Sequence, residues 1–387
     1  MLATIIGIVS LLVWLYLLLA RGGFWRVKKN LPSSRLGTVA ALGRGGKSFR
    51  VAVIVPARNE AEFIGESITS ILSQLGNHSI QIFLVDDGST DGTADAAGKA
   101  AAQTGKSSAL TVITSRPLPA GWTGKLWAVQ QGIERAREFA PEFLLLTDAD
   151  ILHSPDNLAT LIAVAEGGPY DLASFMVKLQ CRTAAEKFLI PAFVFFFFKL
   201  YTPSWISDPH RKTAGAAGGS ILVRPQALER AGGIEAIRGE IIDDCALAKA
   251  VKQQEGRVWL GLTPETVSLR PYKTFAEVGR MISRTAFNQL NHSVLMLFAA
   301  FIGLTLMYLA PPLLLFSRHP LPITLGALAW LLMTAAYLPM VRFYGLNPLW
   351  ALALPFAAIF YMGATLRSAF NFWSGRGGQW KGRTQDS

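Results

Sequence analysis

The sequence predicts an α/β protein: a Rossmann-like domain with a mostly parallel sheet, combined with N-terminal and C-terminal transmembrane helices. Short apolar runs that end in polar or turn residues alternate with helical segments between residues 51 and 287. Long uncharged stretches occupy residues 1–20 and much of 288–366. We therefore divide the chain into an anchor (1–20), a basic juxtamembrane linker (21–50), the α/β domain (51–287), a membrane region (288–366) and a basic tail (367–387).

Composition and charge support this division. Apolar residues make up 51% of the 387 residues, which excludes a disordered chain. Cys181 and Cys245 are the two cysteines, too few for a disulfide scaffold and typical of a reducing compartment. The net charge of +11 divides into +8 over residues 21–50, −2 over 51–287 and +5 over 288–387. Positive charge that borders apolar segments indicates anionic lipid headgroups and not nucleic acid.

The first apolar stretch reads TIIGIVSLLVWLYLLLA and is long enough to cross a bilayer as a helix. The alternative is a cleaved signal peptide, which carries positive charge before its apolar part. Here the charge follows, starting at Arg21 and Arg26. We therefore expect a retained anchor, with the following domain in the cytoplasm. Residues 30–50 are rich in Gly, Ser and basic residues and show no period, as expected of a linker near the membrane.

The α/β domain begins at Arg50. The runs VAVIVP, QIFLVDD, LTVIT and FLLLTDAD are predicted strands, and helices are predicted near 60–75, 91–104, 124–139 and 155–166. This alternation is typical of a parallel α/β sheet.

Within this domain, residues 188–205 read FLIPAFVFFFFKLYTPSW, with eight aromatic side chains, one lysine and two prolines. Because the prolines interrupt it, we expect an interfacial segment over 188–207 that brings a lipid to the domain. A buried core helix is the alternative.

Three C-terminal stretches without full charges, at 285–317, 319–341 and 343–366, are each long enough to cross the membrane. Three crossings would leave the basic tail outside, although its charges prefer the inside. If the tail is inside, either one stretch is re-entrant or the first stretch is split at Pro311 and Pro312 into two short passes. The number of crossings stays open.

The predicted strands deliver polar side chains to one rim, because ligands of open parallel sheets bind at the carboxyl ends of the strands. The first strand ends at Pro56 and Ala57, with Glu60 shortly after. The second ends at Asp86 and Asp87, and the fourth is followed by Asp148 and Asp150. No GxGxxG follows the first strand and no P-loop motif occurs, which argues against a dinucleotide enzyme and a P-loop nucleotidase.

Asp148 and Asp150 are separated by one residue, so both carboxylates turn to the same side and suit Mg²⁺ or Mn²⁺ bridging a diphosphate. The alternative is a helix-capping turn. Asp86 and Asp87 are either turn formers or acceptors for a nucleoside base or ribose hydroxyl. Lys125 opens a helix after a Gly-containing loop, and it is either a cation that faces phosphate or a solvated side chain.

Asp243 and Asp244 open the helical run DDCALAKAVK, where one of them could act as a general base or both could simply stabilise the helix dipole. Arg280 and Arg284 lie one turn apart and could bind a departing nucleotide diphosphate or lipid headgroups. Cys245 is expected to pack. His210 and His292 are isolated, and neither is assigned to a metal.

The motifs together resemble the family 2 glycosyltransferases of the GT-A fold: IVPARNE at 54–60, DDGSTDGT at 86–93, DAD at 148–150 and the Asp pair at 243–244. The chain is also similar to the bacterial hopene-associated glycosyltransferases along essentially its whole length. The segments that carry this are PLPAGWTGKLWAVQQG (117–132), AAGGSILVRPQALERAGG (216–233), IIDDCALAKAVK (241–252), SRTAFNQLNHS (283–293) and WKGR (380–383).

The resemblance implies that Pro56, Ala57, Glu60, Asp86, Asp87, Lys125, Asp148 and Arg284 bind the nucleotide-sugar donor. It implies that Asp148 and Asp150 hold the metal and that Asp244 is the catalytic base. Two departures from the family are visible. Asp243 replaces a glutamate, and the Gln-x-x-Arg-Trp motif of processive synthases appears as MISRT at 281–285, where Arg284 alone matches. Transfer of a single sugar is therefore expected.

The resulting hypothesis is an inverting, Mg²⁺- or Mn²⁺-dependent glycosyltransferase in the bacterial inner membrane, with a cytoplasmic catalytic domain. It would move a sugar from a donor, expected to be UDP-linked, to a membrane lipid hydroxyl, and a hopanoid or another glycolipid precursor is the expected acceptor. Transfer to polyprenyl phosphate is the rival reaction, and a non-catalytic transferase-like membrane component is the rival of another class. The intramembrane segments contain no paired charges, which argues against a transporter.

Overall fold

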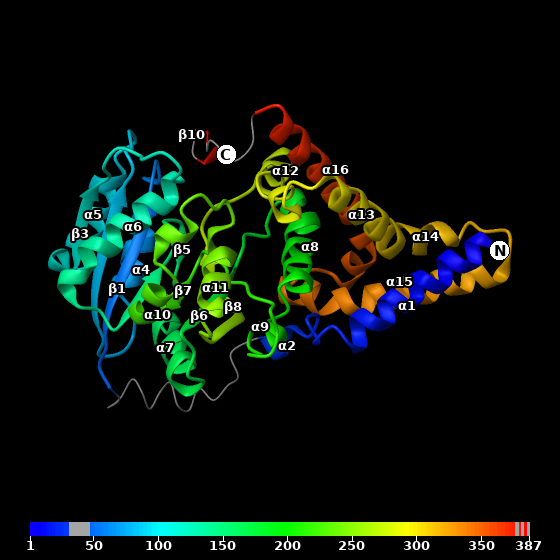
Figure 1. Cartoon of the computed structure of the whole chain (residues 1–387), viewed down its shortest axis with the longest axis horizontal. Coiled ribbons are helices and arrows are strands. Elements are labelled where there is room, and N and C mark those ends of the chain that lie inside the picture. The colour runs from blue at the N-terminus through cyan, green and yellow to red at the C-terminus, as the bar shows by residue number, and fades with distance from the viewer. Residues whose placement is uncertain (31–46, 376–378, 381–382, 385–387) are drawn as a thin grey trace. The chain divides into compact units, whose positions relative to one another are not determined.

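The computed structural model describes residues 1–30, 47–375, 379–380 and 383–384. Most of the predicted linker and part of the basic tail lie outside these residues. The described chain divides into two units. The helical unit comprises Met1–Lys28, Cys181–Ser204 and Pro271–Gly378, and the sheet unit comprises Lys29–Gln180, Trp205–Arg270 and Gln379–Ser387. Figure 1 labels the elements of both.

The sheet unit is built on eight strands in the order β3-β2-β1-β4-β7-β6-β8-β5. Their bounds are β1 (Arg50–Ala57), β2 (Ser79–Asp86), β3 (Leu110–Thr114), β4 (Phe143–Leu146), β5 (Ile151–Leu152), β6 (Leu172–Lys178), β7 (Ile221–Val223) and β8 (Val258–Ser268). Strands β3, β2, β1 and β4 are parallel to one another, as are β6 and β8. β7 is antiparallel to β4 and β6, and β5 is antiparallel to β8. The predicted α/β fold with a mostly parallel sheet is confirmed, with three antiparallel pairs.

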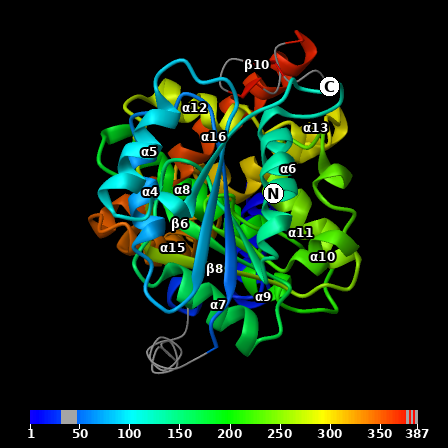
Figure 2. The same cartoon turned by 90° about the vertical axis from the view of Figure 1, so that its left-hand side faces the viewer.

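Helices cover both faces of this sheet, and they bury β1 on both of its sides. Val51, Val53 and Val55 pack in one cluster with apolar residues of α4 (Ile64–Leu72), α5 (Thr93–Gln103) and α7 (Asn157–Gly167). Helix α6 (Gly124–Ala136) lies on the other side of the strands from α4 and α5 (Figure 2). At Gly132 of α6 an added Cβ would come within 2.7 Å of Ile54 Cγ2, so glycine permits this close packing.

Shorter elements complete the sheet unit. They are α10 (Pro225–Arg230), α11 (Asp243–Gln253), and the 3₁₀ turns at Ser107–Ala109, Arg137–Phe139 and Ile234–Ile237. Strands β9 (Gln379–Trp380) and β10 (Arg383–Thr384) form a separate antiparallel pair. The short helices α2 (Val27–Asn30) and α9 (Pro203–Ile206) lie where the chain passes between the units.

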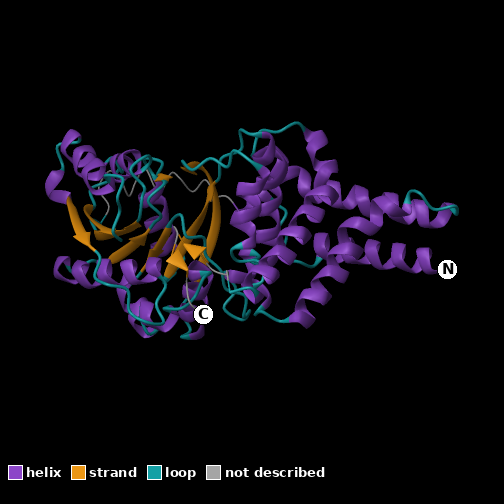
Figure 3. Cartoon of the chain, turned by 90° about the horizontal axis from the view of Figure 1, so that it is seen from above, coloured by secondary structure: helices purple, strands orange, loops and turns teal. Residues whose placement is uncertain are grey.

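The helical unit contains only helices and loops among its described residues, whereas the strands shown in orange belong to the sheet unit (Figure 3). Its elements are α1 (Leu2–Leu19), α8 (Ala184–Leu200), α12 (Phe275–Ser283), a 3₁₀ turn (Asn288–Leu290), α13 (Val294–Leu304), a π-helical turn (Thr305–Leu309), α14 (Ala310–Leu314), α15 (Pro320–Phe343), a 3₁₀ turn (Pro348–Ala353) and α16 (Leu354–Trp373).

Five helical segments of the described chain are long and apolar enough to cross a membrane: Leu2–Leu19, Ala184–Ile206, Val294–Leu314, Pro320–Phe343 and Pro348–Trp373. Large apolar side chains on α1 point outward, with Leu2 71% and Leu12 58% exposed. Inside the unit, the backbone of α1 approaches α15 closely, and a Cβ added at Gly7 would lie 2.9 Å from Leu325 Cβ. Close packing at small residues is typical of helices in lipid.

Two proline-containing segments are more regular than their sequences suggest. Helix α8 starts with a capping box formed by Thr183 and Glu186 and continues through Pro191 to Leu200, so most of the aromatic segment expected at the interface lies in one helix and its end forms the short helix α9. Segment Val294–Leu314 also runs on without a split at Pro311 and Pro312. A π-helical turn, Thr305–Leu309, precedes these prolines, which have no N–H to donate to the carbonyls of the preceding turn. The position of either helix in the membrane stays a prediction.

Candidate active site

The carboxyl ends of the parallel strands bring the predicted donor residues to one rim of the sheet unit. β1 and β2 pair with Ala57 opposite Asp86, and β1 and β4 pair with Ile54 opposite Leu146. The segments that follow these strands therefore start at the same edge of the sheet. A pocket lies at this edge, and its lining residues are Pro56, Lys125, Leu126, Val129, Leu146, Thr147, Asp148, Gly218, Ile221, Ile234, Ile237, Asp243, Asp244 and Leu247.

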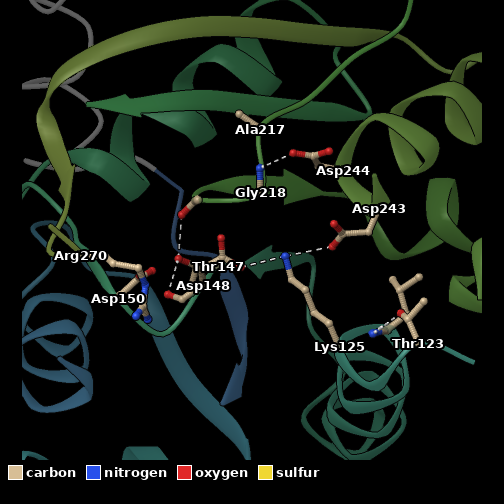
Figure 4. A network of polar contacts seen from close by, with 12 residues as sticks. Thr123, Lys125, Thr147, Asp148, Asp150, Ala217, Gly218, Asp243, Asp244 and Arg270 are labelled. Carbon is tan, nitrogen blue, oxygen red and sulfur yellow. Dashed lines mark hydrogen bonds and ion pairs between the residues drawn. The ribbon is translucent and has the colours of Figure 1, made fainter. Parts of the chain in front are cut away.

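Lys125 lies at the centre of the charged side chains in this pocket (Figure 4). Its Nζ is 2.8 Å from Oδ1 of Asp148 and 3.0 Å from Oδ2 of Asp243. Lys125 is the second residue of α6, whose start is fixed by Thr123, because the Thr123 hydroxyl accepts from the Leu126 N–H. Burial opposes the charge, but Asp148 and Asp243 raise the pKa of Lys125 above its ordinary value. The side chain is therefore a permanent ammonium.

Asp244, the predicted base, is held by two backbone donors. Gly218 N donates to Oδ2 at 2.9 Å, and Cys245 N donates to Oδ1 at 2.7 Å. Burial and the neighbouring Asp243 raise the pKa of Asp244 to about 6, against the opposing effects of Lys125 and the two N–H donors. A carboxylate with this pKa is ionised at pH 7 and basic enough to accept a proton from a reacting group.

Gly218 makes room for this arrangement. A Cβ added there would lie 3.4 Å from Lys125 Nζ, 3.5 Å from Asp148 Oδ2 and 3.6 Å from Asp244 Oδ2. Three charged groups from three different elements thus converge on the open side of one glycine. Gly218 lies within the segment AAGGS (216–220), whose sequence predicts no role for this glycine.

Asp150 is bound differently from Asp148. Its Oδ2 accepts from Arg270 Nε at 2.7 Å, and Arg270 Nη2 also donates to Glu60 Oε2 at 2.5 Å. Arg270 follows β8, so it links the segments after β1 and β4 through their carboxylates. Its guanidinium is held ionised, because Asp150 and Glu60 raise its pKa despite burial. Arg270 was missed in the sequence, where LRPY carries no recognisable motif.

Asp148 is also tied to the segment of Gly218 through its neighbour Thr147. The Thr147 hydroxyl donates to the carbonyl of Gly219 at 2.8 Å and lies 3.0 Å from Nε2 of His153. The other ring nitrogen of His153 faces Asn157 Nδ2 at 3.0 Å. Burial lowers the pKa of His153 to about 4, so the ring is neutral. This buried network positions the Asp148 loop, and it too was missed, because its members are polar residues without a catalytic pattern.

Asp86 and Asp87 lie at the end of β2, as predicted from their position. Asp86 Oδ1 accepts from Ser89 N at 2.9 Å, which is the turn-forming contact considered as the alternative for this residue. Asp87 is buried, at 2% exposed, and its Oδ2 lies 3.4 Å from Arg58 Nη1. The loop after β1 is fixed to the same segment, since Glu60 N donates to the Thr93 hydroxyl at 2.9 Å.

The remaining predicted donor residue, Arg284, belongs to the helical unit and not to the unit that carries the other site residues. It caps the carboxyl end of α12, where its N–H donates to the carbonyl of Arg280 at 3.1 Å. His292, which was not assigned to a metal, stacks on Phe372 with ring centroids 3.9 Å apart.

The donor set at Asp148 and Asp150 suits a hard divalent cation. Mg²⁺ is commonly held by one or two carboxylates and completes its shell with water and substrate phosphate oxygens. Within the described residues, no group of three or more His, Cys, Asp or Glu side chains gathers as a complete metal cage. That these two carboxylates hold an ion stays a prediction: Asp148 lines the pocket and pairs with Lys125, whereas Asp150 pairs with Arg270.

Comparison with known proteins shows similarity to one family over part of the chain. The model of Glycosyl transferase family 2 matches residues 52–229. An undecaprenyl-phosphate 4-deoxy-4-formamido-L-arabinose transferase of Serratia proteamaculans is 32% identical over 126 residues, which cover 32% of this chain and 35% of that protein. The enzyme of the same name from Yersinia enterocolitica is 30% identical over 128 residues, which cover 33% and 36%. The chain thus matches about a third of the length of these relatives.

A solved structure supports the fold. The mannosyltransferase of Pyrobaculum calidifontis, determined in complex with GDP-Man and Mn²⁺, aligns with a TM-score of 0.51 and 20% identity over 96% of this chain and 99% of that chain. At this identity the likeness shows the fold, which is GT-A. The match to the model of Glycosyl transferase family 2 covers residues 52–229, a little under half of the chain, and shows that this part of the chain is similar to that family.

Proposed function

We propose that this protein is an inverting, metal-dependent transferase that moves a single sugar from a nucleotide-sugar to a membrane lipid. The observation that carries the proposal is the position of Lys125 between Asp148 and Asp243, with Asp244 fixed beside them by Gly218. One pocket thereby combines a cation for a diphosphate with a carboxylate that can accept a proton. These are the two groups that sugar transfer to an alcohol needs.

The donor diphosphate would bind next to Lys125, whose ammonium is fully charged and already compensates two carboxylates. Asp148 and Asp150 would hold Mg²⁺ or Mn²⁺, which stabilises the negative charge that develops on the leaving diphosphate. The relative from Pyrobaculum calidifontis, bound to GDP-Man and Mn²⁺, supports a nucleotide-sugar and a divalent ion. We propose UDP as the nucleotide, and GDP is the matched alternative in the test.

In the proposed step the acceptor hydroxyl attacks the anomeric carbon from the side opposite the diphosphate. The new C–O bond forms as the bond from the anomeric carbon to the phosphate oxygen breaks, and the hydroxyl proton passes to Asp244. One displacement inverts the anomeric configuration. Met281 and Thr285 stand where the motif of processive synthases has Gln and Trp, which supports release after one sugar. A hopanoid hydroxyl is the proposed acceptor.

Transfer to polyprenyl phosphate is the second candidate, and it is favoured by the printed activity of the undecaprenyl-phosphate relatives. A phosphate acceptor is already ionised and needs no base. Asp244→Asn should therefore abolish transfer to a hydroxyl but spare transfer to a phosphate.

The membrane helices and the basic residues after α1 support an inner-membrane protein whose sheet unit faces the cytoplasm. In right-side-out vesicles a protease added outside should leave the sheet unit intact, and in inverted vesicles it should cleave it. Cleavage in right-side-out vesicles would contradict this orientation.

The test of function offers the purified full-length protein a panel of UDP- and GDP-sugars with a total lipid extract. The expected result is one new glycolipid, seen by mass spectrometry, together with nucleotide diphosphate release that a chelator stops and Mg²⁺ or Mn²⁺ restores. Treating the lipid extract with phosphatase before the reaction removes phosphomonoester acceptors, so transfer that survives this treatment is transfer to a hydroxyl. No sugar transfer with any donor, from protein that still binds nucleotide, would overturn the proposal.

A further inference from the structure

Lys199 is a basic side chain in an apolar environment that the proposed reaction does not use. It lies in the last turn of α8, one of the segments able to cross a membrane. Its Nζ donates to the Tyr308 hydroxyl at 2.9 Å and lies 3.6 Å from Met307 Sδ. It also lies over the rings of Phe196 and Tyr308, at 5.3 and 4.9 Å from their centroids. A charge in such a helix is expensive and usually functional.

Arg21 brings a second positive charge to the same place. Its Nε and Nη2 donate to the backbone carbonyl of Lys199, at 3.2 and 2.9 Å. Arg21 follows the end of α1, and Lys199 lies near the end of α8, so both cations stand at the boundary of apolar helices. Neither side chain is fully buried. This is the level at which lipid headgroups meet a membrane protein.

The helical unit contains few acidic side chains that could compensate Lys199. Its segments hold thirteen Lys or Arg residues but two acidic ones, Glu186 and Glu277. Glu186 is buried and accepts from the N–H groups of Arg182, Thr183 and Tyr272, and Glu277 accepts from that of Lys273. Among the described residues, no carboxylate oxygen lies within ion-pair distance of Lys199.

The partner of Lys199 is held by an irregular piece of helix. Tyr308 belongs to the π-helical turn Thr305–Leu309 and is fully buried. Trp14 of α1 packs against its ring, with centroids 5.7 Å apart, and donates from Nε1 to the Met307 carbonyl at 2.7 Å. π-helical turns are frequent at functional sites. The turn thus directs the Tyr308 hydroxyl to one N–H of Lys199, which orients the ammonium group.

We infer that Lys199 and Arg21 bind the phosphate group of a membrane lipid. A phosphate offers several anionic oxygens, so it can accept from the remaining ammonium N–H of Lys199 and from the guanidinium of Arg21 together. Tyr308 is a positioning residue for Lys199. The inference rests on the proposed membrane location of the helices and not on the transfer reaction. The phosphate belongs either to a phospholipid headgroup or to a polyprenyl phosphate.

The test measures lipid binding to the full-length protein in a neutral detergent, by native mass spectrometry. Phosphatidic acid is compared with diacylglycerol of the same chains, which lacks the phosphate, and with polyprenyl phosphate. Wild type should retain the phosphate lipid in preference to diacylglycerol. Lys199→Met should weaken this binding by about 10- to 100-fold, the value of one charge-assisted hydrogen bond. Lys187→Met, at the other end of α8, is the matched control and should bind like wild type.

Retention of both phosphate lipids assigns the site to headgroup phosphate in general, and retention of polyprenyl phosphate alone assigns it to that lipid. Equal binding of phosphatidic acid, polyprenyl phosphate and diacylglycerol, or unchanged binding by Lys199→Met, overturns the inference. If Lys199→Met does not fold, Arg21→Met decides, because that side chain contacts a backbone carbonyl at the surface of the helix pair. Since binding is measured without a sugar donor, the result is independent of the proposed transfer.

Discussion

The N–H of Gly218 donates to Oδ2 of Asp244 at 2.9 Å, so the backbone of one segment fixes the carboxylate of another 26 residues away. The contact orients Asp244 and leaves the space beside it open, since glycine has no side chain there. Gly218 therefore contributes two things to the pocket: a backbone N–H that donates to Asp244, and the space that a side chain would fill.

Gly218→Ala should reduce transfer by at least about tenfold while the protein folds normally. The new methyl group would sit 3.4–3.6 Å from Lys125, Asp148 and Asp244, which is tolerable packing but occupies space needed by the reacting groups. The N–H to Asp244 is retained. Steady-state rates measure the loss of transfer, and a thermal melt of the same sample checks that the variant is folded.

A second glycine serves as the control for that substitution. Nothing lies within 4 Å of a Cβ added at Gly98 in α5, so Gly98→Ala should leave transfer unchanged and slightly stabilise the helix. Full activity of Gly218→Ala would show that the reaction does not use the space beside Asp244.

The rate of transfer to a hydroxyl acceptor should fall as the pH drops through about 6. Burial and Asp243 raise the pKa of Asp244 to about 6, and below that pH the proposed base is protonated. Asp244→Asn should lower the rate by about 10²- to 10⁴-fold. It should also remove the acid limb of the pH–rate profile, which is the fall in rate below about pH 6. A pH profile of the initial rate with saturating donor measures it.

Stability should change in the opposite direction. Because the pKa of Asp244 is higher in the folded than in the unfolded protein, protonation favours the folded state, and this contribution grows as the pH falls from about 6 towards 3.8. Asp244→Asn should remove that dependence. A variant that keeps the wild-type limb would exclude Asp244 as the titrating base.

Lys125→Met should reduce transfer by about 10²- to 10³-fold, because it removes the cation next to the leaving diphosphate. It should also move the acid limb to higher pH, since Lys125 lowers the pKa of Asp244. Lys125→Arg keeps the charge and should keep the limb in place. A loss of rate without any movement of the limb would contradict the electrostatic link between Lys125 and Asp244.

Arg270→Met should destabilise the protein by about 1–3 kcal/mol, because Glu60 and Asp150 lose their common partner. The Glu60 side chain is 9% exposed, so water replaces little of the lost interaction. The added substitution Glu60→Gln should restore part of the stability. Unfolding in denaturant, followed in detergent, gives the free energies of all three proteins.

The matched control is Arg135→Met, which breaks the exposed ion pair with Glu138. Such pairs contribute about 0–1 kcal/mol, so this variant should unfold close to wild type. Equal losses for the two arginine variants would mean that Arg270 acts as an ordinary surface residue.

The fold could be predicted from the sequence as far as its local patterns reach. Strands such as β1 and β2 are continuous apolar runs followed by acidic turns, and their order along the chain indicates a parallel sheet. β7, by contrast, has three residues, Ile221–Val223, and its antiparallel place between β4 and β6 depends on contacts distant in sequence. A run this short carries no periodicity that fixes its direction.

The candidate site divides in the same way. Asp148, Asp244 and Lys125 follow from their positions at strand and helix ends, and the structure brings them to one pocket. Arg270 and Gly218 could not be predicted. Their importance comes from which distant carboxylates they meet, and single Arg and Gly residues in a loop carry no such information.

The order in which the chain visits its two units has a practical consequence. It leaves the sheet unit at Gln180, contributes α8 to the helical unit and returns at Trp205, before Gly218 and Asp244 are reached. Deleting both ends of the chain therefore does not give a water-soluble enzyme. Any contiguous fragment that contains the whole pocket retains α8, an apolar helix of 17 residues. Solubilisation would require replacing Cys181–Ser204 with a short polar bridge.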